Sequence, residues 1–566
     1  MRNSSEPPSK WIHPYKALAW FNARLDSMQS ISLRSWVLVV AAAAAELIPF
    51  PIAGPVPLWR RAFCWVCLAP LLCAILRQDR QGKVLRPSLA ALLGYTFGVL
   101  WYAGNCYWIY QTMHIYGGLP GPVALGILFL FSLYLGLYPA LFGWILARLR
   151  ITHSLRRALC ISPFVWVALE LGRARITGFP WDLLGYTQVD NSMLTSLAPI
   201  GGVMMLSFLI VSINALYAGA ALTQGSRTRW FSIAATTVLA AALQLGVIYK
   251  PNGDSADHVA SLLQENLAVG AAMRELAPIS AEDKYQVFTE LSRFPSISMN
   301  KGAKGIFRAP FNKAISSDLI VWPEAPADFA TSDPEFRSEL SYLARSTGTP
   351  VIAGSIGVDF DPAVKSGYHE FGSAAVFNSD GGYLGRYDKI HRVPWGEYVP
   401  YKQLFSFAGQ LIANVGNMEA GNQHKVFELN GHGVGIFICY ESIFGEEVRT
   451  FAKDGAEVFV NISDDGWYGD SGAPWQHLDM ARMRAIENRR WILRDTNTGV
   501  TTSIDPHGRG VFTTPRHVRA AFAFPYDYRS DTTFYTRHGD WFAWICVIVM
   551  AAFLALGLSP GRTHVN

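Results

Sequence analysis

Three residue types that together can transfer an acyl group occur in three short motifs in the second half of the chain. Cys439 follows the apolar run 434–438, Glu324 ends the segment Val321-Trp322-Pro323-Glu324, and Lys389 lies in Tyr387-Asp388-Lys389. A thiol nucleophile needs a base to remove its proton, and a carboxylate in a partly dry pocket can serve. Attack on an acyl carbon creates an oxyanion, which an ammonium and a backbone N–H can stabilise. Glu324, Lys389 and Cys439 are therefore a candidate acyl-transfer set that requires neither histidine nor metal.

Each of these residues also has an ordinary structural interpretation. Cys439 is the only cysteine between Lys250 and Asp540, so it is either a nucleophile or inert packing. A glutamate after proline can cap the segment that follows it, and lysine is usually a solvated surface charge. The other six cysteines lie in or beside apolar segments, where packing is the expected role: Cys64, Cys67, Cys73, Cys106, Cys160 and Cys546.

Alternating strands and helices are expected to position the three motifs. Short apolar runs predict strands, and amphipathic runs predict the helices between them. The predicted strands are 259–263, 318–322, 351–354, 434–439 and 457–461. The predicted helices are 282–291, 334–346 and 476–490, the last with Met480, Met483 and Ile486 on one stripe. This alternation predicts an α/β fold with Cys439 at the end of a core strand.

The composition indicates that a large part of the chain lies in lipid. Only 16% of its 566 residues are charged, whereas soluble proteins carry about a quarter. The net charge of +5 gives no case for binding nucleic acid. Eight apolar runs are candidate membrane spans, and the five clearest meet or exceed the roughly 20 residues that a helix needs to cross a bilayer. They are 36–59, 62–76, 87–112, 119–147, 158–169, 191–226, 230–249 and 541–560.

Basic residues predict how these spans are oriented. Connections near residues 80, 150 and 228, together with the N-terminal arm, are rich in Lys and Arg, which places them in the cytoplasm. Seven spans then put residues 250–540 outside, and the last span returns the tail to the cytoplasm. Four arginines fall on the opposite side as exceptions: Arg60, Arg61, Arg173 and Arg175. No cleavable signal peptide is expected, since the first apolar run comes late.

Taken together, the motifs resemble the nitrilase superfamily and, within it, the membrane-embedded apolipoprotein N-acyltransferase family. The resemblance covers most of the chain. In the first half it rests on Tyr116-Gly117-Gly118-Leu119-Pro120-Gly121-Pro122 and Gly178-Phe179-Pro180-Trp181. In the second half it rests on the three motifs already described and on several further segments. These are Gly396-Glu397-Tyr398-Val399-Pro400, Cys439-Tyr440-Glu441, the run 461–467, Gln476-His477, Ala481-Arg482 and Arg484-Ala485.

The resemblance implies an architecture and a set of roles. It implies a multi-span helical membrane domain over 1–249, a nitrilase-like αββα sandwich over 250–540, and a final span with a tail over 541–566. Glu324 is then the general base, Lys389 stabilises the intermediate and Cys439 is the nucleophile. Three further residues support them: Glu397, Tyr440 and Glu441.

The resemblance also implies substrates and a location. The acyl donor is a phospholipid, and the acceptor is the N-terminal amine of an S-diacylglyceryl-cysteine lipoprotein. The enzyme is expected to act as a monomer without cofactor or metal. It is expected in the bacterial inner membrane as a multi-pass protein, with its catalytic domain on the periplasmic side.

One element departs from the family pattern, and two other functions stay open. The family has a Gln-Gly-Asn/Asp-Ile element and a tryptophan in a mobile arm, whereas this chain has 264–267 (Gln-Glu-Asn-Leu) and no tryptophan between Tyr249 and Trp322. Replacement aromatic surface is available from Trp395, Phe405 and Phe407.

The alternative functions are a membrane-tethered amidase and a non-enzymatic transporter or scaffold. Acidic residues near membrane segments are functional candidates by default, and in this chain these are Glu46 and Glu170.

Overall fold

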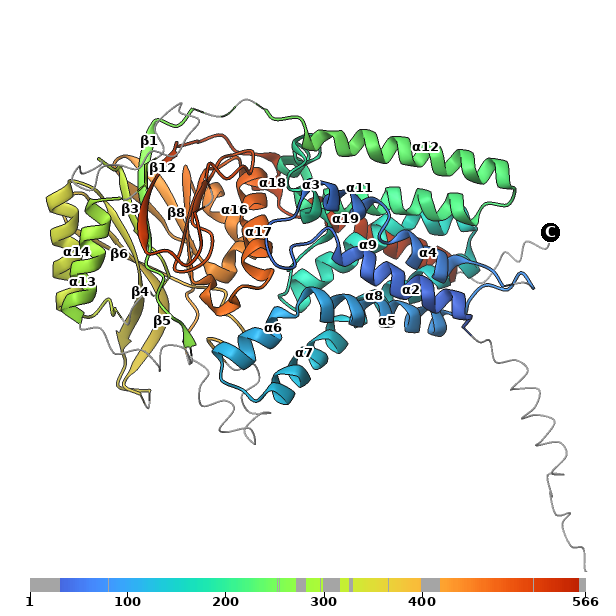
Figure 1. The fold of residues 1–566 in the computed structure, drawn as a ribbon, viewed down its shortest axis with the longest axis horizontal. Coiled ribbons are helices and arrows are strands. Elements are labelled where there is room, and N and C mark those ends of the chain that lie inside the picture. The colour runs from blue at the N-terminus through green and yellow to red at the C-terminus, as the bar shows by residue number, and fades with distance from the viewer. Residues whose placement is uncertain are drawn as a thin grey trace, which may run out of the picture.

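Two facing β-sheets form the centre of one half of the protein, and a helical bundle forms the other half (Figure 1). The computed structural model describes residues 31–558 apart from 80, 252, 254, 271–280, 296, 299–315, 325–328, 365, 399–417 and 513. Phe405 and Phe407 therefore lie outside the described residues, as does most of the N-terminal arm.

The larger sheet has seven strands in the order β2-β12-β1-β3-β4-β5-β6. These strands are β2 (Ile297–Ser298), β12 (Ala520–Tyr526), β1 (His258–Gln264), β3 (Leu319–Trp322), β4 (Val351–Phe360), β5 (Tyr368–Phe377) and β6 (Tyr383–Asp388). Strands β1, β3 and β4 are parallel, and β5 is antiparallel to both β4 and β6. It follows that β3 and β6 run in the same direction and end at the same edge of the sheet.

The smaller sheet has five strands in the order β11-β10-β9-β8-β7. These are β11 (Thr502–Ile504), β10 (Ile492–Thr496), β9 (Val458–Ser463), β8 (His432–Ile438) and β7 (Val426–Leu429). Strands β8, β9 and β10 are parallel, as expected for strands joined by helices. Apolar side chains from both sheets meet in one core, which includes Leu262, Val321, Ile436 and Val460.

Helices cover the outer face of each sheet. α13 (Ala281–Arg293) and α14 (Pro334–Thr347) lie against the larger sheet, while α16 (Gly445–Lys453) and α17 (Ala473–Asn488) lie against the smaller one (Figure 1). The buried residues of α14 repeat at helical spacing (Phe336, Leu340, Leu343), which explains why this helix packs on the sheet by one face. The expected strands and helices and the αββα sandwich are confirmed.

The helical half contains a helix at each predicted span. They are α2 (Leu33–Leu47), α3 (Leu58–Arg61) with α4 (Ala69–Leu76), α5 (Pro87–Asn105), α7 (Gly121–Leu135) with α8 (Leu137–Thr152), α9 (Leu155–Ile176), α11 (Ala198–Leu222), α12 (Ser226–Gln244) and α19 (Trp541–Leu558). Within the described chain, four helical segments are long and apolar enough to cross a membrane: Leu58–Leu76, Gly121–Thr152, Ala198–Leu222 and Ser226–Val247. The count of eight spans stays a prediction.

Two spans differ in detail from their predicted form. The run 119–147 forms two helices, α7 and α8, that meet at Gly136, where a Cβ would lie 2.9 Å from the Val99 side chain. The run 191–226 begins with the separate short helix α10 (Ser192–Thr195), capped by the Asn191 side chain, before α11 starts. Close packing against a neighbouring helix determines where α7 ends, and a side-chain cap determines where α10 begins. Hydropathy carries no information about either contact.

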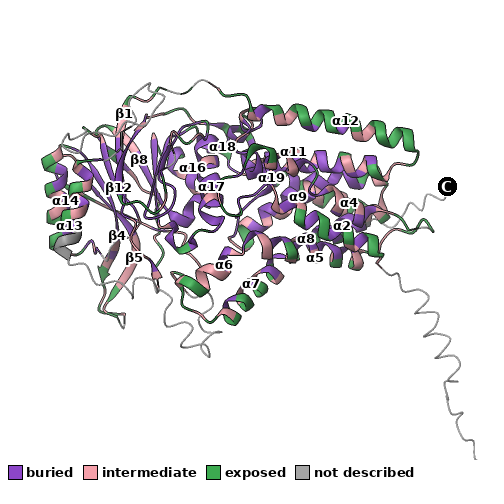
Figure 2. Cartoon of the chain, in the orientation of Figure 1, coloured by how far each residue is buried: buried purple, intermediate pink, exposed green. Residues whose placement is uncertain are grey.

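Helix α17 separates the two halves and is buried on both sides (Figures 1 and 2). Its predicted apolar stripe packs into the core of the helical half. Leu478, Ala481 and Ala485, from its other face, pack into the core between the sheets. One helix therefore contacts both cores, so the two-sheet half rests directly on the helical bundle.

Candidate active site

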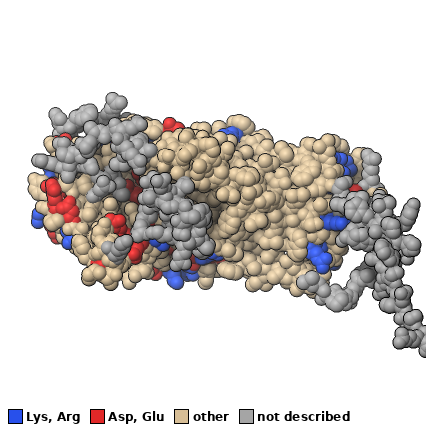
Figure 3. Space-filling view, turned by 90° about the horizontal axis from the view of Figure 1, so that it is seen from below, with Lys and Arg blue, Asp and Glu red and all other residues tan. Residues whose placement is uncertain are grey.

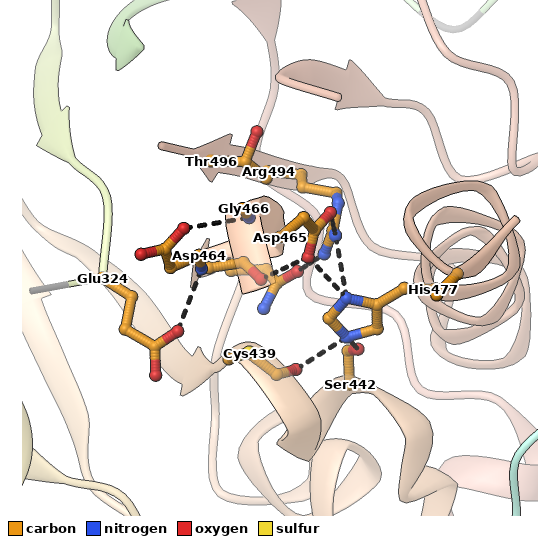
Figure 4. Close-up of polar contacts among 12 residues, drawn as sticks. Glu324, Cys439, Ser442, Asp464, Asp465, Gly466, His477, Arg494 and Thr496 are labelled. Carbon is orange, nitrogen blue, oxygen red and sulfur yellow. Dashed lines mark hydrogen bonds and ion pairs between the residues drawn. The ribbon is translucent and has the colours of Figure 1, made fainter. Parts of the chain in front are cut away.

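The three predicted catalytic residues lie at the ends of strands in both sheets. Glu324 follows β3 and Lys389 follows β6 in the larger sheet, whereas Cys439 follows β8 in the smaller one. The two sheets face each other, so strand ends that are far apart in the sequence meet at one edge of the sandwich. Figure 4 shows Glu324 and Cys439 near each other on separate segments of the chain.

Lys389 holds two carboxylates together. Its Nζ donates to Glu324 Oε1 at 2.8 Å and to Glu397 Oε1 at 2.6 Å, and its side chain is only 1% exposed. Glu397 Oε2 accepts from the Val393 backbone N–H at 2.9 Å. Burial alone would lower the pKa of Lys389, but Glu324 and Glu397 outweigh it and raise that pKa well above its usual value. The ammonium therefore stays charged, as an oxyanion stabiliser must.

Cys439 occupies a sharp turn between β8 and a short 3₁₀ helix (Cys439–Ile443). Its φ is +50°, a left-handed conformation that costs a non-glycine residue on the order of 1–3 kcal/mol and often occurs at functional sites. Burial, followed by the charge of Glu324, raises the pKa of the Cys439 thiol well above its usual value, although Lys389 acts in the opposite direction. At neutral pH the resting group is the thiol, so attack requires a base.

Glu441 fixes the turns that carry both Lys389 and Cys439. Its Oε1 accepts from the backbone N–H groups of Ile390 at 2.6 Å and His391 at 3.1 Å, and its Oε2 accepts from that of Ile438 at 2.7 Å. The segment after β6 and the segment before the thiol thus share one buried carboxylate. Burial raises the pKa of Glu441, with these backbone N–H groups opposing the shift.

Tyr440 connects the active site to the helical half. Its hydroxyl donates to the carbonyl of Gly178 at 2.9 Å, and its ring is 5% exposed. Gly178 belongs to one of the segments of the first half on which the family resemblance rests. The predicted supporting residues therefore have distinct positions: Glu397 binds the ammonium, Glu441 fixes the backbone, and Tyr440 contacts the bundle.

Four further residues, to which the sequence motifs alone assigned no role, surround the site. The Asp464 backbone N–H donates to Glu324 Oε2 at 2.9 Å, so both oxygens of Glu324 are held. Burial, followed by the charge of Glu324, raises the pKa of Asp464 to about 7. Behind the thiol lie Asp465, His477 and Arg494, all of them buried. Asp464, Asp465 and His477 lie in runs that match the family. Only the fold shows which of these residues contact Cys439 or Glu324.

Aromatic surface near the site differs from the family pattern. Trp395, two positions before Glu397, is 39% exposed and has a φ of +65°. In the segment 264–267, which departs from the family pattern, the Gln264 side chain donates to the carbonyls of Pro515 and Val518 at 2.9 Å each, and Glu265 is fully buried. This segment is thus built into the sandwich core.

The acids near membrane segments lie together. Glu46, Glu170 and Arg173 line one small cavity between helices of the bundle. Glu170 Oε1 accepts from the Leu184 backbone N–H at 2.9 Å and from Trp166 Nε1 at 3.0 Å, which gives this acid a structural role. In the described part of the chain, no group of three or more His, Cys, Asp or Glu side chains is arranged to hold a metal ion.

A buried thiol, a charged lysine and a glutamate at the strand ends of a two-sheet sandwich define an enzyme of the carbon–nitrogen hydrolase class. The family model for carbon-nitrogen hydrolase matches residues 240–523, and the model for the apolipoprotein N-acyltransferase N-terminal domain matches residues 48–216. The chain belongs to the apolipoprotein N-acyltransferase family.

Individual relatives extend over nearly the full chain. The apolipoprotein N-acyltransferase of Geobacter metallireducens is 34% identical over 553 residues, which are 96% of this chain and 98% of the relative. That of Methylococcus capsulatus is 32% identical over 511 residues, 89% of this chain and 93% of the relative. Among solved structures, Saccharomyces cerevisiae Nit3, a member of branch 10 of the nitrilase superfamily, is 15% identical with a TM-score of 0.33, covering 49% of this chain and 92% of Nit3.

Proposed function

We propose that this protein transfers an acyl chain from a phospholipid to the N-terminal amine of S-diacylglyceryl-cysteine in lipoproteins, through a thioester on Cys439. The observation that carries the proposal is Lys389, a buried ammonium held between Glu324 and Glu397. Because the same domain rests on a bundle of apolar helices, a lipid ester is the acyl donor that can reach it by lateral diffusion. The full-length relatives support the choice of acceptor.

In the first half-reaction Glu324 removes the proton of the Cys439 thiol as the sulfur attacks the ester carbonyl. The oxyanion lies between the Lys389 ammonium and the Tyr440 backbone N–H. When the C–O bond breaks, Glu324 returns the proton to the leaving oxygen and lysophospholipid departs. The thioester on Cys439 stores the acyl group.

In the second half-reaction the free amine of the diacylglyceryl cysteine attacks the thioester. Glu324 accepts a proton from the attacking nitrogen, and the same two donors hold the second oxyanion. The C–S bond breaks, the amide is formed, and the proton returns to the Cys439 sulfur. The catalytic domain acts on the periplasmic side of the inner membrane, as a monomer.

Mass spectrometry tests the covalent step. Purified protein incubated with phospholipid alone is expected to gain one acyl group on Cys439, removable by neutral hydroxylamine. Cys439→Ala is expected to gain none, although Cys160 remains exposed in that variant. An adduct that persists in Cys439→Ala, or an unmodified wild type, would refute the proposal.

A further inference from the structure

Resting on this proposed function, we infer that His477 is a positioning residue that aims the oxyanion-binding N–H of Tyr440. His477 Nε2 lies 3.0 Å from the carbonyl oxygen of Cys439. That carbonyl and the Tyr440 N–H belong to the same peptide unit, which is planar and trans. A bond that fixes the carbonyl therefore fixes the direction of the N–H on its opposite side.

The turn at Cys439 needs such a restraint because its backbone is in the left-handed region. Glu441 holds the preceding residue through the Ile438 N–H at 2.7 Å. His477 holds the following peptide through its carbonyl. The bond also polarises that peptide, so its N–H becomes a stronger donor to developing negative charge.

The ring proton of His477 is assigned to Nε2, with the Arg494 guanidinium as the donor to Nδ1. Nε2 lies 3.0 Å from the Cys439 carbonyl oxygen, which can only accept, and 2.7 Å from Ser442 Oγ, which can accept as well. Nδ1 lies 2.9 Å from Asp465 Oδ1 and 3.1 Å from Arg494 Nη2, and Arg494 also pairs with Asp465 Oδ2 at 2.7 Å. Burial and the charge of Arg494 lower the pKa of His477, which keeps the ring neutral. Figure 4 shows the ring between the Asp465–Arg494 pair and the backbone of Cys439.

The helical half fixes the same ring from another side. Trp181 stacks on His477 with ring centroids 5.8 Å apart and planes inclined by 21°. The indole Nε1 of Trp181 donates to Oε1 of the neighbouring Gln476 at 2.8 Å. The rotation of the His477 ring is thus fixed by Asp465, Arg494, Ser442 and Trp181, and its Nε2 edge faces the backbone of the nucleophile.

Two amide variants of unequal reach separate this role from simple packing. In His477→Gln the side-chain NH2 occupies the place of Nε2 and can still donate to Cys439. In His477→Asn the shorter amide takes the place of Nδ1, so it keeps Asp465 as a partner but does not reach the carbonyl. The Asp465–Arg494 pair remains intact in both variants.

The experiment compares two reactions of the same sulfur. Alkylation of Cys439 by iodoacetamide, located by peptide mass spectrometry, forms no oxyanion, whereas acylation by phospholipid does. For His477→Asn we expect acylation to slow by about 100-fold or more, the usual effect of losing one oxyanion donor, with alkylation changed by less than about threefold. His477→Gln should recover most of the acylation rate.

Parallel loss of both reactions in His477→Asn would assign His477 a purely structural role and overturn the inference, as would wild-type acylation in that variant. Failure of the proposed function looks different. In that case the wild type itself is alkylated at Cys439 but never acylated by phospholipid, and the inference is rejected with it.

Discussion

At the scale of single residues, the site is organised by the charge of Lys389. One buried ammonium faces two carboxylates, Glu324 and Glu397, and removing it leaves two like charges close together. Each of these carboxylates also accepts a backbone N–H, from Asp464 and Val393 respectively, so neither can easily swing away. In the proposed mechanism Lys389 therefore has two roles, because it stabilises the oxyanion and also holds Glu324, the proposed base, in position.

The first prediction tests this double role. Lys389→Ala is expected to slow acylation of Cys439 by at least about 1,000-fold, since it removes an oxyanion partner and leaves Glu324 beside an unneutralised Glu397. Glu397→Gln keeps a hydrogen-bond acceptor for Lys389 and should slow acylation by about 10-fold. The measurement is the single-turnover rate of thioester formation. Equal losses in the two variants would contradict the separate role of the ammonium.

The second prediction concerns Glu265, a fully buried acid in the segment that departs from the family pattern. Burial, followed by the like charge of Asp495, raises the pKa of Glu265 well above its usual value. The folded state therefore binds a proton that the unfolded state releases, so this contribution to stability is present at low pH and is lost as pH rises through the folded pKa. Glu265→Met is expected to raise the thermal midpoint by several degrees at pH 8 and by less at pH 5.

The exposed Glu428 supplies the matched control for this comparison. Glu428→Met, the same substitution at an exposed position, should leave the thermal midpoint nearly unchanged at both pH values. A Glu265→Met variant that is less stable than the wild type at pH 8 would show that packing of this side chain outweighs its electrostatic cost.

At the scale of elements, α17 connects the helical bundle to the nucleophile. Asp479 and Arg482 on this helix form a closed ion network with two residues of the first half. Arg61 Nη2 lies 2.8 Å from Asp479 and 3.0 Å from Asp190, and Arg482 lies 3.0 Å and 2.7 Å from the same two aspartates. The two positive and two negative charges balance.

The third prediction follows from this balance. Arg61→Met should destabilise the protein by about 3 kcal/mol, because it leaves an uncompensated buried carboxylate. Adding Asp479→Asn restores neutrality and should recover much of that loss. Thermal unfolding of the two single variants and the double variant in detergent measures the coupling energy. Additive effects would mean that the network does not act as a unit.

Elements differ in how far the sequence determines them. Strand–helix alternation predicted β1, β3, β8, β9 and α17 because the pattern of apolar residues is local. The apolar stripe of Met480, Met483 and Ile486 was predicted in the same way. The sequence did not show that this stripe packs against the helical bundle. Arg61 and Asp479 are 418 positions apart, and only the fold brings them together.

The same limit applies to the candidate site. Glu324, Lys389 and Cys439 were predicted from motifs, whereas the contact of His477 with the Cys439 carbonyl was not. That contact depends on how α17 packs against the 3₁₀ turn that follows β8. Two of the four arginine exceptions to the basic-residue rule have a similar origin, since Arg61 and Arg175 pair with acids of the two-sheet half.

At the scale of the whole molecule, charge is separated along the long axis. On the face drawn in Figure 3, Lys and Arg lie at the end of the bundle remote from the sheets, and a broad region with few charged side chains lies between that end and the two-sheet half. The connections at this end carry Arg77, Lys83, Arg86, Arg148 and Arg157, among others. Basic residues at one end of an uncharged belt are the pattern of a cytoplasmic membrane face.

The fourth prediction is the orientation that this pattern implies. Reporters inserted after Gly82, His153 or Thr228 are expected to read cytoplasmic. One inserted at the exposed turn of Asp380, between β5 and β6, is expected to read periplasmic. A cytoplasmic signal at Asp380 would place the catalytic domain on the wrong side for lipoprotein substrates and would refute the proposed location.

The fifth prediction separates the transferase from a hydrolase with the same site. Cys439 is 6% exposed, and aromatic rings of both halves, Trp108, Trp181 and Tyr468, pack together beside His477. Water has little access to a thioester in these surroundings, so the acyl-enzyme should persist when phospholipid is the only substrate. A diacylglyceryl peptide with a free amine should discharge it and give ping-pong kinetics, whereas the same peptide with an acetylated amine should not. Rapid discharge by water with no transfer to the peptide would instead assign the protein as a membrane-bound amidase.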